Sequence, residues 1–230
     1  SLNPAMRIDK QMIEGIRLHT NLSKQEARER AAKILQQVGI PDPERVLKNY
    51  PHQLSGGMSQ RVMIAMAMSC NPQLLIADEP TTALDVTIQA QILELMQDLQ
   101  KKLGMAIIMV THDLGVIASM CDEIIVMYGG RVCERGTADD IFYRPAHEYT
   151  KGLLRSIPKA DNMNEKLVPI GGTPINLLQM PAGCAFCPRC DAAMKICLSE
   201  KPEELRISDT HLASCWMNIK ELYEAQEEAE

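Results

Sequence analysis

Leu54-Ser55-Gly56-Gly57-Met58-Ser59-Gln60-Arg61 is the stretch of sequence that decides the fold. It is followed by the apolar run Leu74-Leu75-Ile76-Ala77 and then by Asp78-Glu79. Two successive glycines let the backbone direct N–H groups toward an anion without an obstructing Cβ, and Ser55 adds a hydroxyl. A helix that begins there adds further N–H donors and the positive end of its dipole. The apolar run is short and does not alternate, which predicts a parallel strand buried on both faces. Together the segments predict a phosphate-binding turn and a strand ending in two carboxylates.

The two carboxylates and a later histidine are candidates for metal and water chemistry. Asp78 suits a water-mediated contact with Mg²⁺, and Glu79 suits orienting or deprotonating an attacking water. His112 ends the next predicted strand, where a neutral imidazole could bind a phosphate oxygen. Each feature alone also has an ordinary structural explanation, since acidic turns follow many strands and His112-Asp113 could simply cap a helix.

The remaining pattern predicts strands and helices in alternation, hence a parallel sheet covered by helices and closed by an antiparallel hairpin at one edge. Ser23 and Glu26 form a capping box, and Gly39 is a left-handed helix end. The expected elements are mostly helix over 5–50, a helix from about 58 to Asn71-Pro72, a strand at 74–77, a helix at 88–103, a strand at 106–110, a helix at 114–120, strands at 124–127 and 132–134 around Gly129-Gly130, an extended segment at 158–183 and a charged helix over the last fifteen residues.

Composition excludes several classes of protein. With 230 residues and 46% hydrophobic content, the chain is long enough to form one large or two small domains with hydrophobic cores. Its net charge of −6 argues against a nucleic-acid partner. No apolar stretch reaches the ~18 residues that span a bilayer, so we expect any membrane role to act through a partner. The start, Ser1-Leu2-Asn3-Pro4, has neither an initiator Met nor a signal segment and indicates a cut inside a longer protein.

Four segments in this order resemble those of ATP-binding cassette (ABC) proteins. Residues 54–61, 74–79, 81–85 and 111–113 are similar to the signature, Walker B, D-loop and switch-histidine segments. The resemblance implies an α/β fold, a partial P-loop-NTPase-type ABC ATPase domain in which a helical subdomain accompanies a mostly parallel sheet. Its expected parts are a helical remnant at 1–57, the C-terminal part of the core at 58–157 and a cysteine-rich extension at 158–230. No G-x-x-x-x-G-K-[ST] occurs, so the resemblance implies that the amino-terminal third of the family's domain, with its Walker A loop, would be missing from this sequence.

The resemblance also implies site roles. Glu79 and His112 would serve the attacking water and the γ-phosphate, and Asp78 would serve Mg²⁺. ATP held by an opposite subunit would meet Ser55, Gly56, Gly57, Gln60 and Asp85, the last at the dimer interface. One departure is Met58, where the family usually has Gln, which puts a side-chain contact in doubt but not the backbone contacts.

Together with the cysteine-rich tail, two more segments narrow the resemblance to di- and oligopeptide import ATPases, a group that includes nickel importers. These are 50–53 (Tyr-Pro-His-Gln) and 144–150 (Arg-Pro-Ala-His-Glu-Tyr-Thr). The implied function is ATP hydrolysis that drives an importer from the cytoplasmic face of the membrane. Its partners would be a second ATPase subunit, transmembrane permeases and, indirectly, an extracytoplasmic binding protein. We expect this chain alone to be inactive. The alternative is a non-catalytic, metal-binding interaction module built on an ABC remnant.

The cysteine-rich extension predicts a metal site. Cys184-x2-Cys187-x2-Cys190-x6-Cys197, with Cys215 beyond, suits an iron–sulfur cluster or structural Zn²⁺, and disulfides are the least favoured alternative. Spacing alone favours Cys184, Cys187 and Cys190 as ligands. The resemblance implies instead a 4Fe–4S cluster held by Cys184, Cys190, Cys197 and Cys215, with Zn²⁺ as the alternative and Cys187 open. Cys70, Cys121 and Cys133 stand in apolar contexts typical of packing.

Overall fold

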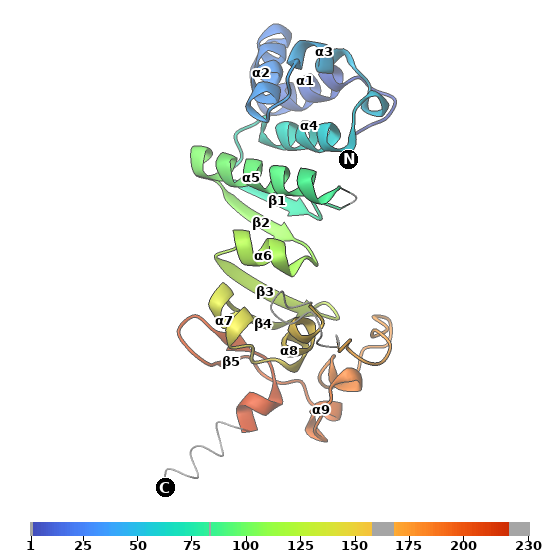
Figure 1. Cartoon of the computed structure of the whole chain (residues 1–230), viewed down its shortest axis with the longest axis vertical. Coiled ribbons are helices and arrows are strands. Elements are labelled where there is room, and N and C mark those ends of the chain that lie inside the picture. The colour runs from blue at the N-terminus through green and yellow to red at the C-terminus, as the bar shows by residue number, and fades with distance from the viewer. Residues whose placement is uncertain (1, 83, 158–167, 221–230) are drawn as a thin grey trace. The chain divides into compact units, whose positions relative to one another are not determined.

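The computed structural model describes residues 2–82, 84–157 and 168–220 (Figure 1). The chain divides into two compact units, residues 1–116 and 117–230, with α6 (Leu114–Met120) running across the division. The elements of the first unit are α1 (Ile8–His19), α2 (Lys24–Gln37), α3 (Pro43–Lys48), the 3-10 turn η1 (Pro51–Gln53), α4 (Gly56–Met68), β1 (Leu74–Asp78), α5 (Val86–Leu103) and β2 (Ala106–Val110).

The first four helices form a small bundle whose ends follow the sequence prediction. The capping box is confirmed, because Ser23 Oγ accepts from Glu26 N and Glu26 Oε2 accepts from Ser23 N at 2.8 Å. Gly39 lies just beyond α2 at φ +79°, as predicted for a left-handed helix end. Side chains such as Ile16 and Leu35 are completely buried between the helices.

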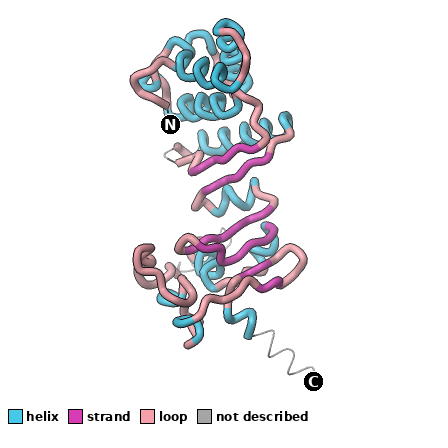
Figure 2. The backbone as a smooth tube through the Cα atoms, turned by 180° about the vertical axis from the view of Figure 1, so that it is seen from behind, coloured by secondary structure: helices cyan, strands magenta, loops and turns pink. Residues whose placement is uncertain are grey.

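A two-stranded parallel sheet follows the bundle, and α5 lies along β1 (Figures 1 and 2). The prediction that β1 is buried on both faces is wrong. Leu75 and Ala77 are buried, whereas Ile76 is 63% exposed and its cross-strand partner Ile108 is 48% exposed. Within the described residues nothing covers that face, so an apolar run that would suit a doubly covered strand is covered on one side only.

The second unit contains β3 (Glu123–Tyr128), β4 (Arg131–Thr137), α7 (Ala138–Tyr143), α8 (Glu148–Arg155), the 3-10 turn η2 (Cys187–Arg189), α9 (Ile196–Ser199), β5 (Leu205–Arg206) and β6 (Leu212–Ala213). The hairpin is confirmed: β3 and β4 are antiparallel, and Gly129 and Gly130 at its turn both have positive φ. The hairpin does not close the parallel sheet as expected. It joins a separate four-stranded antiparallel sheet in the order β3-β4-β6-β5, and the pattern of the extension predicts neither β5 nor β6.

A buried carboxylate ties the extension to this hairpin. Glu134 on β4 is completely buried, and its two carboxylate oxygens accept hydrogen bonds from the backbone N–H groups of Ala146 (2.7 Å) and His147 (2.9 Å). His211, next to β6, is 2% exposed and places Nε2 2.7 Å from Glu134 Oε1. One side chain thus holds both the 144–150 segment and the strand that the extension adds to the sheet.

The extension has little regular structure, as expected. Residues 168–183 form neither helix nor strand, 158–167 lie outside the described residues, and the expected terminal helix is described only over 216–220. Among the helices that the structure describes, none is long and apolar enough to cross a membrane.

Candidate functional site

The signature turn, residues 54–61, begins α4. Ser55 is the N-cap, and its Oγ accepts from Met58 N at 3.3 Å. Gly56 and Gly57 occupy the first helical turn, where backbone N–H groups have no partner within the helix. Neither glycine has a positive φ, so an unusual backbone conformation is not what requires them.

The turn requires glycines because there is little space for a side chain. A Cβ on Gly57 would lie 2.9 Å from Cγ2 of Ile88 on α5, which is closer than carbon atoms approach without a shift. A Cβ on Gly56 would lie 3.6 Å from Cδ2 of Leu84, an ordinary contact. The turn is thus packed directly against the start of α5.

Arg61, the last residue of the signature turn, ties the turn to both α2 and α5. Its guanidinium donates to the carbonyl of Val38 at the end of α2 (2.6 Å) and to Gln91 Oε1 on α5 (3.4 Å). Gln60 is half-buried on the same helix, and its predicted contact with ATP stays a prediction.

The parallel register brings Glu79 and His112 together. Because Asp78 is aligned with Val110, the residues that follow the two strands leave the same edge of the sheet. Nδ1 of His112 lies 2.7 Å from Glu79 Oε1, and Thr82 Oγ1 donates to Glu79 Oε2 at 2.9 Å. Both carboxylate oxygens of Glu79 therefore have a partner.

These contacts stabilise the charged forms of both groups. The hydrogen bond with His112, followed by that from Thr82, lowers the pKa of the Glu79 carboxyl from its ordinary value, and the carboxylate raises the pKa of His112. Glu79 adopts φ +48°, a left-handed conformation uncommon for a residue with a side chain. Its amide donates to the carbonyl of Val110 at 2.8 Å, which helps to hold this conformation.

The structure places the other two acidic candidates at the same end of the sheet. Asp78 is the exposed last residue of β1, available to a cation. Asp85 caps α5 by accepting from Ile88 N at 3.0 Å. That bond accounts for an acidic residue at this position, and its predicted place in a dimer interface stays a prediction.

Sequence reasoning missed one connection at this site. Asp113 accepts from Gly115 N (2.9 Å) and Val116 N (3.2 Å) and so caps α6, as a helix-cap interpretation of His112-Asp113 suggests. Its other oxygen accepts from Gln89 Nε2 at 3.0 Å. This hydrogen bond ties the loop that carries His112 to α5, and no local sequence signal marks Gln89 for it.

Five thiols of the extension line one small cavity together with Trp216 and Met217; they are Cys184, Cys187, Cys190, Cys197 and Cys215. Burial raises the pKa of several of these thiols, that of Cys190 to about 11. The donor set thus suits a soft metal. However, the described residues include no group of three or more His, Cys, Asp or Glu side chains positioned to hold a metal ion, so the expected four-thiolate ligand set is not assembled in this arrangement.

Two of the remaining cysteines take part in core packing, as predicted. Cys133 is buried against Tyr128, Ala185 and Phe186, and Cys121 packs against the β3–α7 core.

Comparison with known proteins finds matches along most of the chain. A family model described as "ABC transporter" matches residues 1–82, and one described as "Oligopeptide/dipeptide transporter, C-terminal region" matches residues 133–197. The oligopeptide transport ATP-binding protein OppD of Escherichia coli (strain K12) is 51% identical over 222 residues, which are 96% of this chain and 66% of OppD. The chain therefore spans slightly less than two thirds of the length of that relative.

Two further comparisons agree. The oligopeptide transport ATP-binding protein AppD of Bacillus subtilis (strain 168) is 52% identical over 224 residues, 96% of this chain and 67% of its own length. Among solved structures, the dimeric ATP-binding cassette MJ0796, in a post-hydrolysis state with ADP and phosphate, matches with a TM-score of 0.53 at 31% identity. That match covers 60% of this chain and 59% of the other.

Proposed function

Because this chain belongs to the family of ATP-binding subunits of oligopeptide and dipeptide ABC transporters, we propose that it supplies the signature side and the water-positioning carboxylate of a peptide importer's ATPase. The observation that carries this proposal is Glu79, held between His112 and Thr82 where β1 and β2 end. A carboxylate fixed through both oxygens at the carboxyl end of a parallel sheet is positioned to act on a ligand there.

In this proposal Glu79 positions water more than it removes a proton. Its two hydrogen bonds stabilise the carboxylate, which makes the group a weaker base but a better-oriented acceptor. The side chain of His112 is 85% exposed, so its ring can replace its hydrogen bond to Glu79 with a hydrogen bond to a phosphate oxygen. Such positioning and charge stabilisation account for most of phosphoryl-transfer catalysis.

The remaining roles concern binding. Asp78 would hold Mg²⁺, which neutralises charge on the phosphates when bound. Ser55, with the amides of Gly56 and Gly57, would contact the γ-phosphate of ATP held by a second subunit, with Gln60 and Asp85 nearby at that interface. The packing of Gly57 on Ile88 keeps this helix start close to α5 and supports the arrangement.

The 230-residue chain alone should not hydrolyse ATP, since its sequence contains no G-x-x-x-x-G-K-[ST] loop to hold the β- and γ-phosphates. The test is phosphate release by the purified chain, alone and mixed with a separately produced segment of a peptide-transport relative that carries this loop. We expect activity only in the mixture and its loss with Glu79→Gln. Turnover by the chain alone that Glu79→Gln abolishes would contradict the proposal.

The proposed setting is the cytoplasmic face of the membrane. The chain would pair with a second ATPase subunit, dock on transmembrane permeases and serve an extracytoplasmic binding protein indirectly. Di- or oligopeptides are the proposed cargo, since the matched family is named for them. Nickel, the other cargo that the resemblance implies, is named in neither matched family description.

The five thiols around one cavity favour a second candidate, a metal-binding interaction module. Here a 4Fe–4S cluster, or alternatively Zn²⁺, would be held by Cys184, Cys190, Cys197 and Cys215, with Cys187 as a substitute ligand. Binding would have to reorient and deprotonate the thiols.

Iron, sulfide and zinc analysis of protein purified without oxygen tests the metal site. About four iron per chain with absorbance near ~400 nm would establish the cluster. One zinc ion per chain, in a colourless protein, would establish a structural zinc site instead. Absence of both metals would refute the metal site and leave the ATPase proposal standing.

A further inference from the structure

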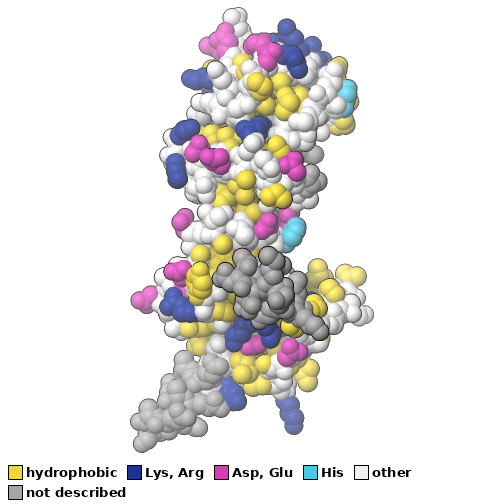
Figure 3. Space-filling view, viewed as in Figure 1, with side chains coloured by type: hydrophobic (Ala, Val, Ile, Leu, Met, Phe, Trp, Pro, Cys, Tyr) yellow, Lys and Arg dark blue, Asp and Glu magenta, His cyan; other side chains and the backbone are white. Residues whose placement is uncertain are grey.

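His112, which the proposed function places at the γ-phosphate, is not held in place by packing. Its side chain is 85% exposed, and its ring contacts the Glu79 carboxylate at 2.7 Å. Histidine side chains, cyan in Figure 3, are visible at the surface of the molecule. Because exposed side chains change rotamer freely, the position of this ring depends on the backbone that carries it.

Asp113 fixes that backbone. Its amide donates to Thr111 Oγ1 at 3.1 Å, on the other side of His112. Its Oδ1 accepts from the amides of Gly115 (2.9 Å) and Val116 (3.2 Å) in the first turn of α6. The turn that carries the histidine is therefore held by hydrogen bonds that all involve Asp113.

Gln89 joins this turn to α5. Its Nε2 donates to Asp113 Oδ2 at 3.0 Å, the oxygen that does not cap α6. Burial acts to raise the pKa of Asp113, but the hydrogen bonds from Gln89 and from the two amides of α6 lower it from its ordinary value. The acceptor is therefore an anion at neutral pH, and a hydrogen bond to a charged group is stronger than one between neutral groups.

The donor lies on a part of α5 that other contacts hold in place. Ile88, the residue before Gln89, packs so closely on Gly57 of the signature turn that a Cβ there would lie 2.9 Å from its Cγ2. Two residues after Gln89, Gln91 accepts from Arg61 at 3.4 Å. A group supported by fixed neighbours keeps a defined geometry, so this stretch of α5 can serve as a platform for the turn.

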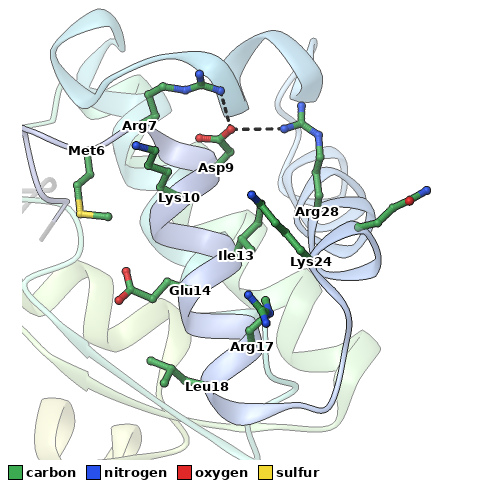
Figure 4. Close-up of a pocket in the computed structure, with 11 residues that line it drawn as sticks. Met6, Arg7, Asp9, Lys10, Ile13, Glu14, Arg17, Leu18, Lys24 and Arg28 are labelled. Carbon is green, nitrogen blue, oxygen red and sulfur yellow. Dashed lines mark hydrogen bonds and ion pairs between the residues drawn. The ribbon is translucent and has the colours of Figure 1, made fainter.

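The support continues into the helical bundle. Arg61 also donates to the carbonyl of Val38 at the end of α2, at 2.6 Å. Figure 4 shows Arg7 and Arg28 directed at the Asp9 carboxylate, and the bond from Arg28 (3.4 Å) joins α2 to α1. The platform on α5 is thus connected to the helices of the same unit.

We propose that Gln89 is a positioning residue for His112: by holding Asp113 it keeps the imidazole beside Glu79 where β1 and β2 end. The inference rests on the proposed function, since it names the residue that places the group proposed to meet the γ-phosphate. Gln89 itself touches neither phosphate nor water in this role. Without its hydrogen bond the turn keeps its cap on α6 but loses its tie to α5, so the ring leaves the sheet edge more often.

The first measurement needs no nucleotide. In the 230-residue chain at neutral pH, the ring ¹⁵N NMR signals of His112, identified by their loss in His112→Asn, report its contact with the carboxylate. We expect Gln89→Ala to move these signals toward those of Glu79→Ala, in which the ring has lost its partner. The matched control is Gln100→Ala, the same change at a half-buried position near the other end of α5, which should leave the signals unchanged.

A pair of variants separates this hydrogen bond from general damage to the fold. Gln89→Glu places a second carboxylate against Asp113 and should move the signals further than Gln89→Ala does, because like charges repel. Adding Asp113→Asn restores the hydrogen bond with donor and acceptor exchanged, while Asn still caps α6. We expect the double variant to recover the signals of the unchanged chain.

Phosphate release by the chain mixed with the loop-bearing segment then tests the consequence. Gln89→Ala should lower kcat about threefold to tenfold, the value of one hydrogen bond, with little change in KM for ATP. Gln100→Ala should change neither constant, and Gln89→Glu with Asp113→Asn should restore kcat.

Unmoved His112 signals in Gln89→Ala, or no recovery in the double variant, would overturn the proposal. So would equal kcat for Gln89→Ala and Gln100→Ala when His112→Ala abolishes turnover. Full turnover by His112→Ala would instead overturn the proposed function of His112, and the NMR comparison would still decide whether Gln89 positions its ring.

Discussion

Replacing Glu134 should destabilise the second unit by an amount that depends on how many hydrogen bonds the new side chain keeps. Glu134→Ala leaves the amides of Ala146 and His147 and the ring of His211 without their acceptor in a buried site. Removing one member of a buried, hydrogen-bonded pair typically costs about 3–5 kcal/mol. Glu134→Gln has nearly the same shape and keeps one oxygen, so it should lose about 1–3 kcal/mol, the cost of one unsatisfied donor.

Urea unfolding followed by tryptophan fluorescence measures these losses directly. Trp216 is the only tryptophan, and its indole donates to the carbonyl of Glu200 within the extension, so the signal reports the second unit alone. The control is Glu204→Gln, which removes a half-exposed partner of Arg135 and should cost at most about 1 kcal/mol. A loss for Glu134→Ala no greater than that for Glu204→Gln would refute the view that this carboxylate anchors the extension.

Three further predictions concern other parts of the chain. Hydrogen bonds from Thr137 and Thr210 lower the pKa of buried Asp140 from 3.8 to about 2; the folded state therefore binds this proton less tightly than the unfolded state, and stability should be lost as pH falls from about 4 to about 2. The same unfolding assay should show Asp140→Asn removing this dependence while exposed Asp139→Asn retains it. Gly57→Ala should lower the thermal midpoint by crowding Ile88, and Ile88→Ala in the same chain should restore part of the loss; an additive double variant would argue against the contact. Ile76→Lys should reduce self-association in sedimentation velocity without lowering stability, because this exposed apolar side chain lies on the uncovered sheet face.

Local signals in the sequence predict most of the elements and the core of the candidate site. The capping box at Ser23, the left-handed helix end at Gly39 and the hairpin at Gly129-Gly130 each depend on chemistry within a few residues, and each is confirmed. The proximity of Glu79 and His112 also follows, because parallel strands leave the sheet at a common edge.

What the sequence does not predict depends on distant partners. Glu134 and His211 are 77 residues apart, and nothing near either residue indicates their contact. The composition of β1 predicts burial on both faces, whereas the actual exposure depends on what covers each face. The size requirement at Gly57 likewise comes from Ile88 on another helix, not from the backbone angles that a glycine pair suggests.

The left-handed backbone at Glu79 sets stability and function against each other at one position. A residue with a Cβ at φ +48° stores on the order of 1–3 kcal/mol of strain. Glycine there would release the strain and also delete the carboxylate, so selection for thermal stability alone would favour loss of the proposed water-positioning group. Glu79→Gln keeps a Cβ and hence the strained backbone. Comparing its ATP turnover with that of the unchanged chain therefore isolates the effect of the carboxylate. A library screened for resistance to heat should therefore accumulate Gly at this position, and one screened for ATP turnover in the reconstituted pair should exclude it.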